Sequence, residues 1–134
     1  MGRRRTPPHR YAIWFAQISA TARDGKMDEL QIVYTTEAMQ DILGISDYYF
    51  DKVGESAALR AVDALQNHID KLMRFPRMGE EHPDEYLKAL NFRKLVHDNH
   101  IVIYRVDTET VIIERIVWAS SNYPELFQQG VPAL

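Results

Sequence analysis

The chain is predicted to form an α+β domain in which strands and helices follow one another in the order β-α-α-β-β-β. Three observations lead to this fold class: a short β-rich stretch early in the chain, two stretches with apolar residues at helical spacing, and three final β-type runs joined by short polar connections. We expect a twisted, mostly antiparallel sheet with the two helices packed as a hairpin on one face, because neither helix can bury its apolar face alone.

The first strand and the first helix are expected to be consecutive. The strand is predicted over Gln31 to Thr35, where the sequence QIVYT favours β structure. Thr36 stands at the expected helix N-cap, and Glu37 follows in the first turn, where the helix dipole stabilises a carboxylate. Gly54 is expected to end this helix. Its predicted apolar face consists of Ala38, Ile42, Ile45 and Tyr49.

A second helix is predicted from about Glu55 to Arg74. Polar and charged residues occupy its other faces, which is typical of a helix with one side against a core. Its expected buried face consists of Ala58, Val62, Leu65, Ile69, Leu72 and Met73. Because a single glycine-centred turn joins the two helices, they should form an antiparallel hairpin.

The second half of the chain is predicted to be mainly β structure. The sequence FPRMG over residues 75–79 breaks the second helix, and the acidic stretch from Glu80 to Glu85 is expected to be an exposed loop. The three β-type runs that follow are Tyr86 to Val96, Ile101 to Val106 and Val111 to Ala119. The short connections HDNH and DTET fit antiparallel hairpins, so these runs should form a meander. The first strand must then pair with one of them.

Composition limits the chemistry. The absence of cysteine excludes disulfides, thiolate metal sites and a cysteine nucleophile, and it fits a reducing cytoplasm, where we expect the protein to act. Residues 1–26 hold six Lys/Arg and one acid, so subtraction from the totals of 16 and 19 leaves ten basic and eighteen acidic residues, a net charge of −8, in residues 27–134. A domain this acidic is a poor general binder of nucleic acid.

The first 26 residues differ from the rest. Three arginines precede Pro7 and Pro8, and a short, mostly apolar stretch follows. We interpret residues 1–26 as a basic leader or upstream extension, poorly ordered, with the domain spanning residues 27–134 and beginning near Met27. A native disordered arm and a signal peptide are the alternatives.

Across about Met27 to Phe127 the sequence resembles the ParE/RelE toxin superfamily of type II toxin–antitoxin systems. The segments that carry the resemblance are QIVYTTEAMQDILGISDYYFDKVG, ALQNHIDKLMRFPRMGEE, LNFRKLV and IVIYRVDTETVIIERIVWA. The LxxFPxMG stretch, followed by the strand with Arg93, is the most specific part. The resemblance implies the α+β fold described above and a toxin that a cognate antitoxin neutralises.

The superfamily has two branches that differ in chemistry. RelE-like members cleave mRNA in the ribosome with basic residues and often a C-terminal tyrosine, whereas ParE-like members inhibit DNA gyrase and need no catalytic residues. In an ungapped comparison, the positions of two nuclease arginines fall on Ile101 and Ser121, and the terminal tyrosine falls on Phe127. The phosphate-stabilising charge of the nuclease is therefore missing. The comparison favours a gyrase inhibitor that is not an enzyme, with no catalytic residues assigned.

Two other functions stay open. One is a ribosome-dependent endoribonuclease with a rearranged active site. The other is a homologue that has lost toxicity and acts only as a binding or regulatory partner of its antitoxin. Overexpression without antitoxin would be harmless only in the last case.

Seven residues are candidates for contacts with the target or the antitoxin: Arg93, Lys94, Arg105, Arg115, Trp118, Tyr123 and Phe127. The four basic residues lie on the predicted sheet, where ordinary ion-paired strand residues are the alternative interpretation. The aromatic residues are of the type that dominates interface energetics, although a tyrosine just past a final strand, such as Tyr123, more often packs against the core.

The resemblance also implies the partners. We expect an antitoxin of the ParD or RelB type whose disordered tail folds on the toxin within a larger hetero-oligomer, and a contribution of the C-terminal tail, Tyr123 to Leu134, to toxicity. No sequence feature requires a metal or an organic cofactor. His97 and His100 flank the HDNH turn without further ligands nearby, so an exposed turn is expected there instead of a metal site.

Overall fold

The computed structural model describes residues 29–130, so the predicted leader lies outside the described residues. The elements are β1 (Gln31–Tyr34), α2 (Thr36–Val53), α3 (Glu55–Asp70), the 3-10 helix η1 (Lys71–Met73), β2 (Glu80–Glu81), α4 (Glu85–Ala89), β3 (Arg93–His97), β4 (His100–Asp107), β5 (Thr110–Trp118) and α5 (Pro124–Gly130). None of the helices within this range is both long and apolar enough to cross a membrane.

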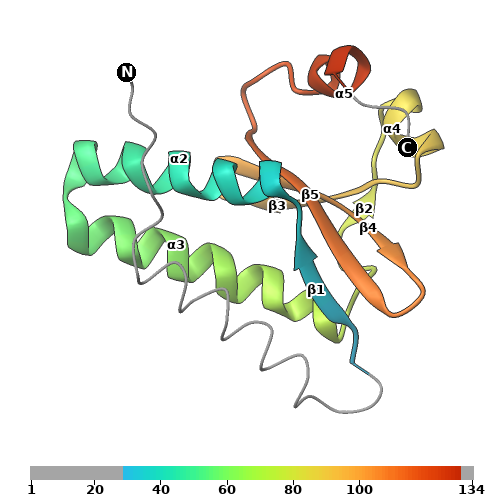
Figure 1. Ribbon diagram of the computed structural model, residues 1–134, viewed down its shortest axis with the longest axis horizontal. Coiled ribbons are helices and arrows are strands. Elements are labelled where there is room, and N and C mark those ends of the chain that lie inside the picture. The colour runs from blue at the N-terminus through green and yellow to red at the C-terminus, as the bar shows by residue number, and fades with distance from the viewer. Residues whose placement is uncertain (1–28, 131–134) are drawn as a thin grey trace.

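The strands form one mixed sheet in the order β1-β5-β4-β3-β2. The last four strands pair antiparallel, and β1 adds to the edge of β5 in parallel register, with Ile32 opposite Val111 and Tyr34 opposite Ile113. The predicted α+β class and mostly antiparallel sheet are confirmed. Figure 1 shows α2 and α3 as a hairpin beside one face of the sheet, and α4 and α5 close together at another side.

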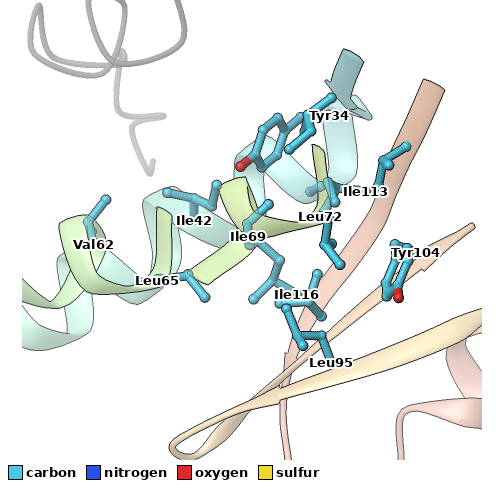
Figure 2. Close-up of a cluster of buried hydrophobic side chains, with 14 of the residues drawn as sticks. Tyr34, Ile42, Val62, Leu65, Ile69, Leu72, Leu95, Tyr104, Ile113 and Ile116 are labelled. Atoms are coloured by element: carbon cyan, nitrogen blue, oxygen red, sulfur yellow. The ribbon is translucent and has the colours of Figure 1, made fainter. Parts of the chain in front are cut away.

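The main core fills the space between the helical hairpin and the sheet (Figure 2). Every residue of the predicted apolar face of α3 and η1 is buried, and Ala38, Ile42 and Ile45 of α2 are buried as well, while Tyr49 is half-buried. Burial of each valine, leucine, isoleucine or methionine in these faces stabilises the fold by about 1.5–3 kcal/mol. The helical spacing of these residues in the sequence therefore determines which faces meet the sheet. The expected hairpin is confirmed.

A β-bulge interrupts the alternation along β5. Ile103 pairs with Arg115 and Tyr104 pairs with Ile113, so Glu114 is the extra residue. Val111 and Ile113 before the bulge, and Ile116 after it, belong to the main core, whereas Val117 belongs to a second apolar cluster. The side chains of β5 therefore do not alternate between the two faces of the sheet without interruption along the whole strand.

The start of α2 covers the edge of β5 where β1 ends. Thr35, and not Thr36 as predicted, is the N-cap: its hydroxyl accepts the N–H of Ala38 at 3.0 Å and donates to the Glu114 carbonyl at 2.9 Å. One turn later, the Asp41 carboxylate accepts the backbone N–H of Ile116 at 2.8 Å. These polar contacts satisfy backbone groups that a longer β1 would otherwise pair.

The prediction of a strand from Tyr86 to Val96 is wrong in its first half. Residues 85–89 form the short helix α4, and β3 begins only at Arg93. Asp84 caps this helix by accepting the N–H groups of Tyr86 and Leu87, and the fully buried Leu87 anchors it. The apolar residues of this run therefore belong to a helical turn, which local β-type composition does not reveal.

The acidic stretch over residues 80–85 is likewise more than the predicted exposed loop. Glu80 and Glu81 form β2 and pair with Lys94 and Arg93 of β3. His82, the next residue, is only 2% exposed. The stretch is thus tied to the sheet by its backbone, although the glutamate side chains remain exposed.

Asp70, at the end of α3, is expected to make the stability of the protein depend on pH. Its Oδ1 atom is buried without a hydrogen-bond partner among the described residues, and burial raises the pKa of the carboxyl group from 3.8 to about 6. Because the folded state holds this proton more tightly than the unfolded state, the contribution of Asp70 to stability falls as the pH rises from about 4 through about 6.

Asp70→Asn is therefore expected to stabilise the protein at pH 8 and to have no such benefit at pH 3.5 or below. The carboxylate is partly exposed, so solvent screening limits the gain to about 1 kcal/mol. Denaturant unfolding of both proteins across this pH range measures the difference between their free energies of unfolding. Both proteins contain the same histidines, so the contributions of these residues cancel in the difference. An equal difference at every pH would contradict the titration of Asp70 as the cause.

Candidate partner-binding groove

The FPRMG stretch is fastened to the sheet by a buried tyrosine. The Tyr104 hydroxyl donates to the Pro76 carbonyl at 2.7 Å and accepts the N–H of Gly79 at 3.0 Å. Arg93 on β3 donates its Nε–H to the Gly79 carbonyl at 2.9 Å. Burial raises the pKa of Tyr104, which keeps the hydroxyl protonated as a donor. The FPRMG motif is thus held against the sheet by these hydrogen bonds, and its Gly79 carbonyl in turn orients Arg93.

A groove lies between this clamped loop and the turn that joins α4 to β3. Three cations line it, Arg77, Lys88 and Arg93, together with a single carboxylate, Glu81. The remaining lining residues are Leu30, Met73, Pro76, Asn91, Phe92, Val106 and Thr108. The site therefore combines a positive rim with apolar side chains.

The other three predicted basic residues are engaged in ion pairs on the sheet. The Lys94 ammonium lies 3.5 Å from Glu80, and the Arg105 Nε lies 2.7 Å from Glu114. Arg115 makes two bonds to Asp41, at 2.8 and 3.0 Å. These contacts match the alternative interpretation of ion-paired strand residues. Arg93 alone of the four lines the groove.

Trp118 belongs to an aromatic cluster at the end of β5. Its ring lies 4.3 Å from the ring of His100 and 5.0 Å from that of Tyr48 on α2, measured between centroids. Trp118 is half-buried and Tyr48 is exposed, so the cluster reaches the surface. It lies at the opposite end of β4 from the groove residue Val106, and the two surfaces are separate.

Tyr123 and Phe127 are buried in the second apolar cluster, which also contains Leu87, Phe92, Ile101, Ile103 and Val117. The Tyr123 hydroxyl lies 2.8 Å from His82 Nε2, while His82 Nδ1 accepts the N–H of Asp84. Nε2 therefore carries the proton and donates to Tyr123. Burial lowers the pKa of His82 and favours this neutral form. The packing interpretation of Tyr123 is confirmed, and α5, which the sequence analysis did not predict, is held on the sheet.

The HDNH turn is less exposed than predicted. Asp98 and Asn99 are exposed, but His100 is only 3% exposed and His97 is half-buried. His97 Nδ1 lies 2.9 Å from His68 Nδ1, so one ring donates and the other accepts. Burial first, and then His97, lowers the pKa of His68. The pair joins the end of α3 to the end of β3, and this tertiary contact explains the departure from an exposed turn.

Comparison with known proteins gives the family. Residues 32–123 match the family model of the ParE toxin of the type II toxin–antitoxin system parDE. The chain belongs to the ParE toxin family. A solved structure from a chromosomal ParDE toxin–antitoxin system of P. aeruginosa has the same fold, with a TM-score of 0.60 at 23% identity, covering 69% of this chain and 99% of the other. A search of curated proteins finds no match.

In this ParE-family chain, the positions compared with the RelE-like nucleases are not arranged as an active site. Ile101 and Phe127 are both 6% exposed and lie in the second apolar cluster. Ser121 is exposed and donates its hydroxyl to the Trp118 carbonyl at 2.7 Å. Two of the three positions are thus part of a hydrophobic core that α5 covers.

Two groove residues of this ParE-family protein, Arg77 and Lys88, are not among the candidates that the sequence suggests. Arg77 lies within the FPRMG motif, so the motif itself was a signal for it. Lys88 was placed in a predicted strand, and only the correct assignment of α4 brings it beside Arg93.

Proposed function

We propose that this protein is the toxin of a ParDE-type pair, that it acts by binding and inhibiting DNA gyrase without catalysing a reaction, and that a cognate antitoxin of the ParD or RelB type neutralises it. The observation that carries the proposal is the apolar burial of Ile101 and Phe127 in a ParE-family chain. RNA cleavage requires groups that stabilise a crowded phosphorane and move protons, and an aliphatic and a phenyl side chain supply neither.

Trp118 and Tyr48 are the proposed contacts with gyrase. They form an accessible aromatic pair, and large aromatic side chains contribute most to protein–protein binding energy. Tyr123 and Phe127 support this surface indirectly, because their burial holds the segment after β5 in place.

The proposal predicts that the full-length protein inhibits DNA supercoiling by purified gyrase and that the cognate antitoxin reverses the inhibition. Trp118→Ala should weaken the inhibition by at least about tenfold, because tenfold corresponds to about 1.4 kcal/mol and truncation of an interface hot spot, a class enriched in tryptophan, costs about 2 kcal/mol or more. Tyr86→Ala, at a 40% exposed aromatic residue on α4, is the matched control and should inhibit like the parent.

Failure of a folded, antitoxin-binding preparation to inhibit gyrase would reject the proposed target. Equal loss of inhibition in both variants would reject Trp118 as a specific contact. Thermal unfolding of each variant separates a lost contact from a lost fold.

One observation favours the endoribonuclease alternative. Tyr123 and His82 form a hydrogen-bonded pair of groups that can carry protons, and Lys94 lies near enough to affect the pKa of His82. Ribosome-dependent mRNA cleavage that Tyr123→Phe abolishes would establish that alternative. The burial of both side chains argues against it, because a catalytic pair must reach its substrate.

A further inference from the structure

The aromatic cluster at the end of β5 already contains one contact between a cation and a ring. The Lys52 ammonium lies 5.7 Å from the centroid of the Tyr48 ring, within the distance of about 6 Å at which the face of an aromatic ring attracts a cation. Lys52 follows Tyr48 by one turn of α2, and both residues are exposed. The contact is therefore made at the surface, where a cation from another molecule can take the place of the lysine.

Neighbouring rings hold Tyr48 in position. Its ring lies 5.3 Å from that of Tyr49 and 5.0 Å from that of Trp118, measured between centroids, and both contacts are edge-to-face. Trp118 packs in turn on His100, which is only 3% exposed. A ring that its neighbours already fix loses little conformational entropy when a ligand packs on it. The cluster thus presents a pre-organised aromatic face to a partner.

The charges around the cluster are negative. Asp51 follows Tyr48 by three residues on α2, so both side chains share one face of the helix, and the carboxylate is exposed. Burial lowers the pKa of His100, which is therefore neutral at pH 7, and the charge of Asp98 opposes this shift. The exposed Asp98 carboxylate thus lies close to the cluster as well. Aromatic rings between carboxylates favour a cationic ligand and repel a phosphate backbone.

We propose that the surface formed by Tyr48 and Trp118 binds an arginine or lysine side chain from a basic segment of a protein partner. The proposal rests on the proposed function in one respect, because gyrase is the partner expected to present that segment. The incoming cation packs on the face of Tyr48, with Asp51 beside it, and displaces the Lys52 ammonium into solvent. Lys52 is then an internal competitor that occupies the ring in the free protein.

The test is an NMR titration of the isotope-labelled full-length protein with a synthetic peptide in which arginine alternates with glycine. The resonances of Tyr48 and the indole N–H of Trp118 are expected to shift, whereas those of Tyr86, an exposed aromatic residue on α4, should not. A peptide with citrulline, the uncharged analogue of arginine, should bind at least about twofold more weakly, because it lacks the cation. Equal affinity for the two peptides would overturn the proposal.

Two substitutions in the cluster should change the affinity for the arginine peptide in opposite directions. Tyr48→Leu keeps an apolar side chain but removes the ring, and it should weaken binding about two- to fivefold, as expected for the loss of one exposed cation–aromatic contact. Lys52→Gln removes the competing ammonium and should strengthen binding by a similar factor.

Each substitution has a matched control outside the cluster. Tyr86→Leu makes the same aromatic change on α4, and Lys71→Gln removes the same charge from another exposed lysine. Both variants should bind the arginine peptide like the parent. Unchanged binding in Tyr48→Leu would contradict the proposal, and so would equal effects of the two lysine variants. Thermal unfolding verifies that every variant is folded, and Lys52→Gln, at an exposed position, tests the proposal even if Tyr48→Leu does not fold.

This proposal and the proposed function can fail separately. If gyrase is inhibited but the arginine and citrulline peptides bind alike, the target is right and the cation site is wrong. If gyrase is unaffected but the arginine peptide binds in a way that depends on Tyr48 and Lys52, the cation site holds and the proposed target is wrong.

Discussion

Gly79→Ala is expected to lower the free energy of unfolding by about 2–3 kcal/mol, which is typical of atoms forced into a packed interior. A Cβ atom at this position would lie 2.5 Å from the Lys94 carbonyl oxygen and 2.7 Å from the Tyr104 hydroxyl. Neither neighbour can move easily, because one is strand backbone and the other is a fully buried ring. The clash also disturbs the carbonyl that holds Arg93.

Gly44→Ala provides the control for this experiment. Gly44 is an exposed glycine within α2, and a Cβ built there meets nothing within 4 Å. Alanine should stabilise this helix by up to about 1 kcal/mol. Denaturant unfolding of both variants measures the two effects, which should have opposite signs. A neutral Gly79→Ala would show that the loop over residues 75–79 is not clamped as described.

Asp41→Ala is expected to lower the free energy of unfolding by about 2–3 kcal/mol. Asp41 accepts two bonds from Arg115 and one from the backbone N–H of Ile116, at the edge of β5 that β1 leaves open. Its removal deprives a partly buried guanidinium and a backbone donor of the carboxylate that they share, which costs more than the intact pair contributes.

Asp51→Ala serves as the control for Asp41, because Asp51 is an exposed carboxylate on the same helix. Its replacement should change the free energy of unfolding by less than about 0.5 kcal/mol. Hydrogen exchange at the Ile116 amide gives an independent measurement, since only the Asp41 variant should accelerate it. Unchanged protection at Ile116 would mean that Asp41 does not cover the edge of the sheet.

The candidate site could be predicted only in part. Arg93 was identified because it follows a recognisable motif, and it does line the groove. Lys94, Arg105 and Arg115 are also basic residues on the same sheet, yet each has a carboxylate partner. The partner of Arg115 lies 74 positions away in the chain, so no local pattern distinguishes it from a free cation.

The order of the main elements and the faces that they bury follow from the amino-acid sequence alone. Helical spacing identified the core residues of α2 and α3, and the glycine between them placed the hairpin turn, because periodicity and turn preferences act over a few neighbouring residues. The family resemblance followed from the same ordered segments, and the match over residues 32–123 bears it out.

Four features depend instead on tertiary contacts: the parallel pairing of β1 with β5, the bulge at Glu114, the helix α4, and the burial of His82 and His100. Each depends on groups far apart in the chain: the Thr35 hydroxyl, for example, bonds a carbonyl 79 residues later. The groove has the same origin, because Arg77, Lys88 and Arg93 meet only when the loop, α4 and β3 fold together. Local sequence preferences are weak compared with the free energy of packing, which selects these contacts.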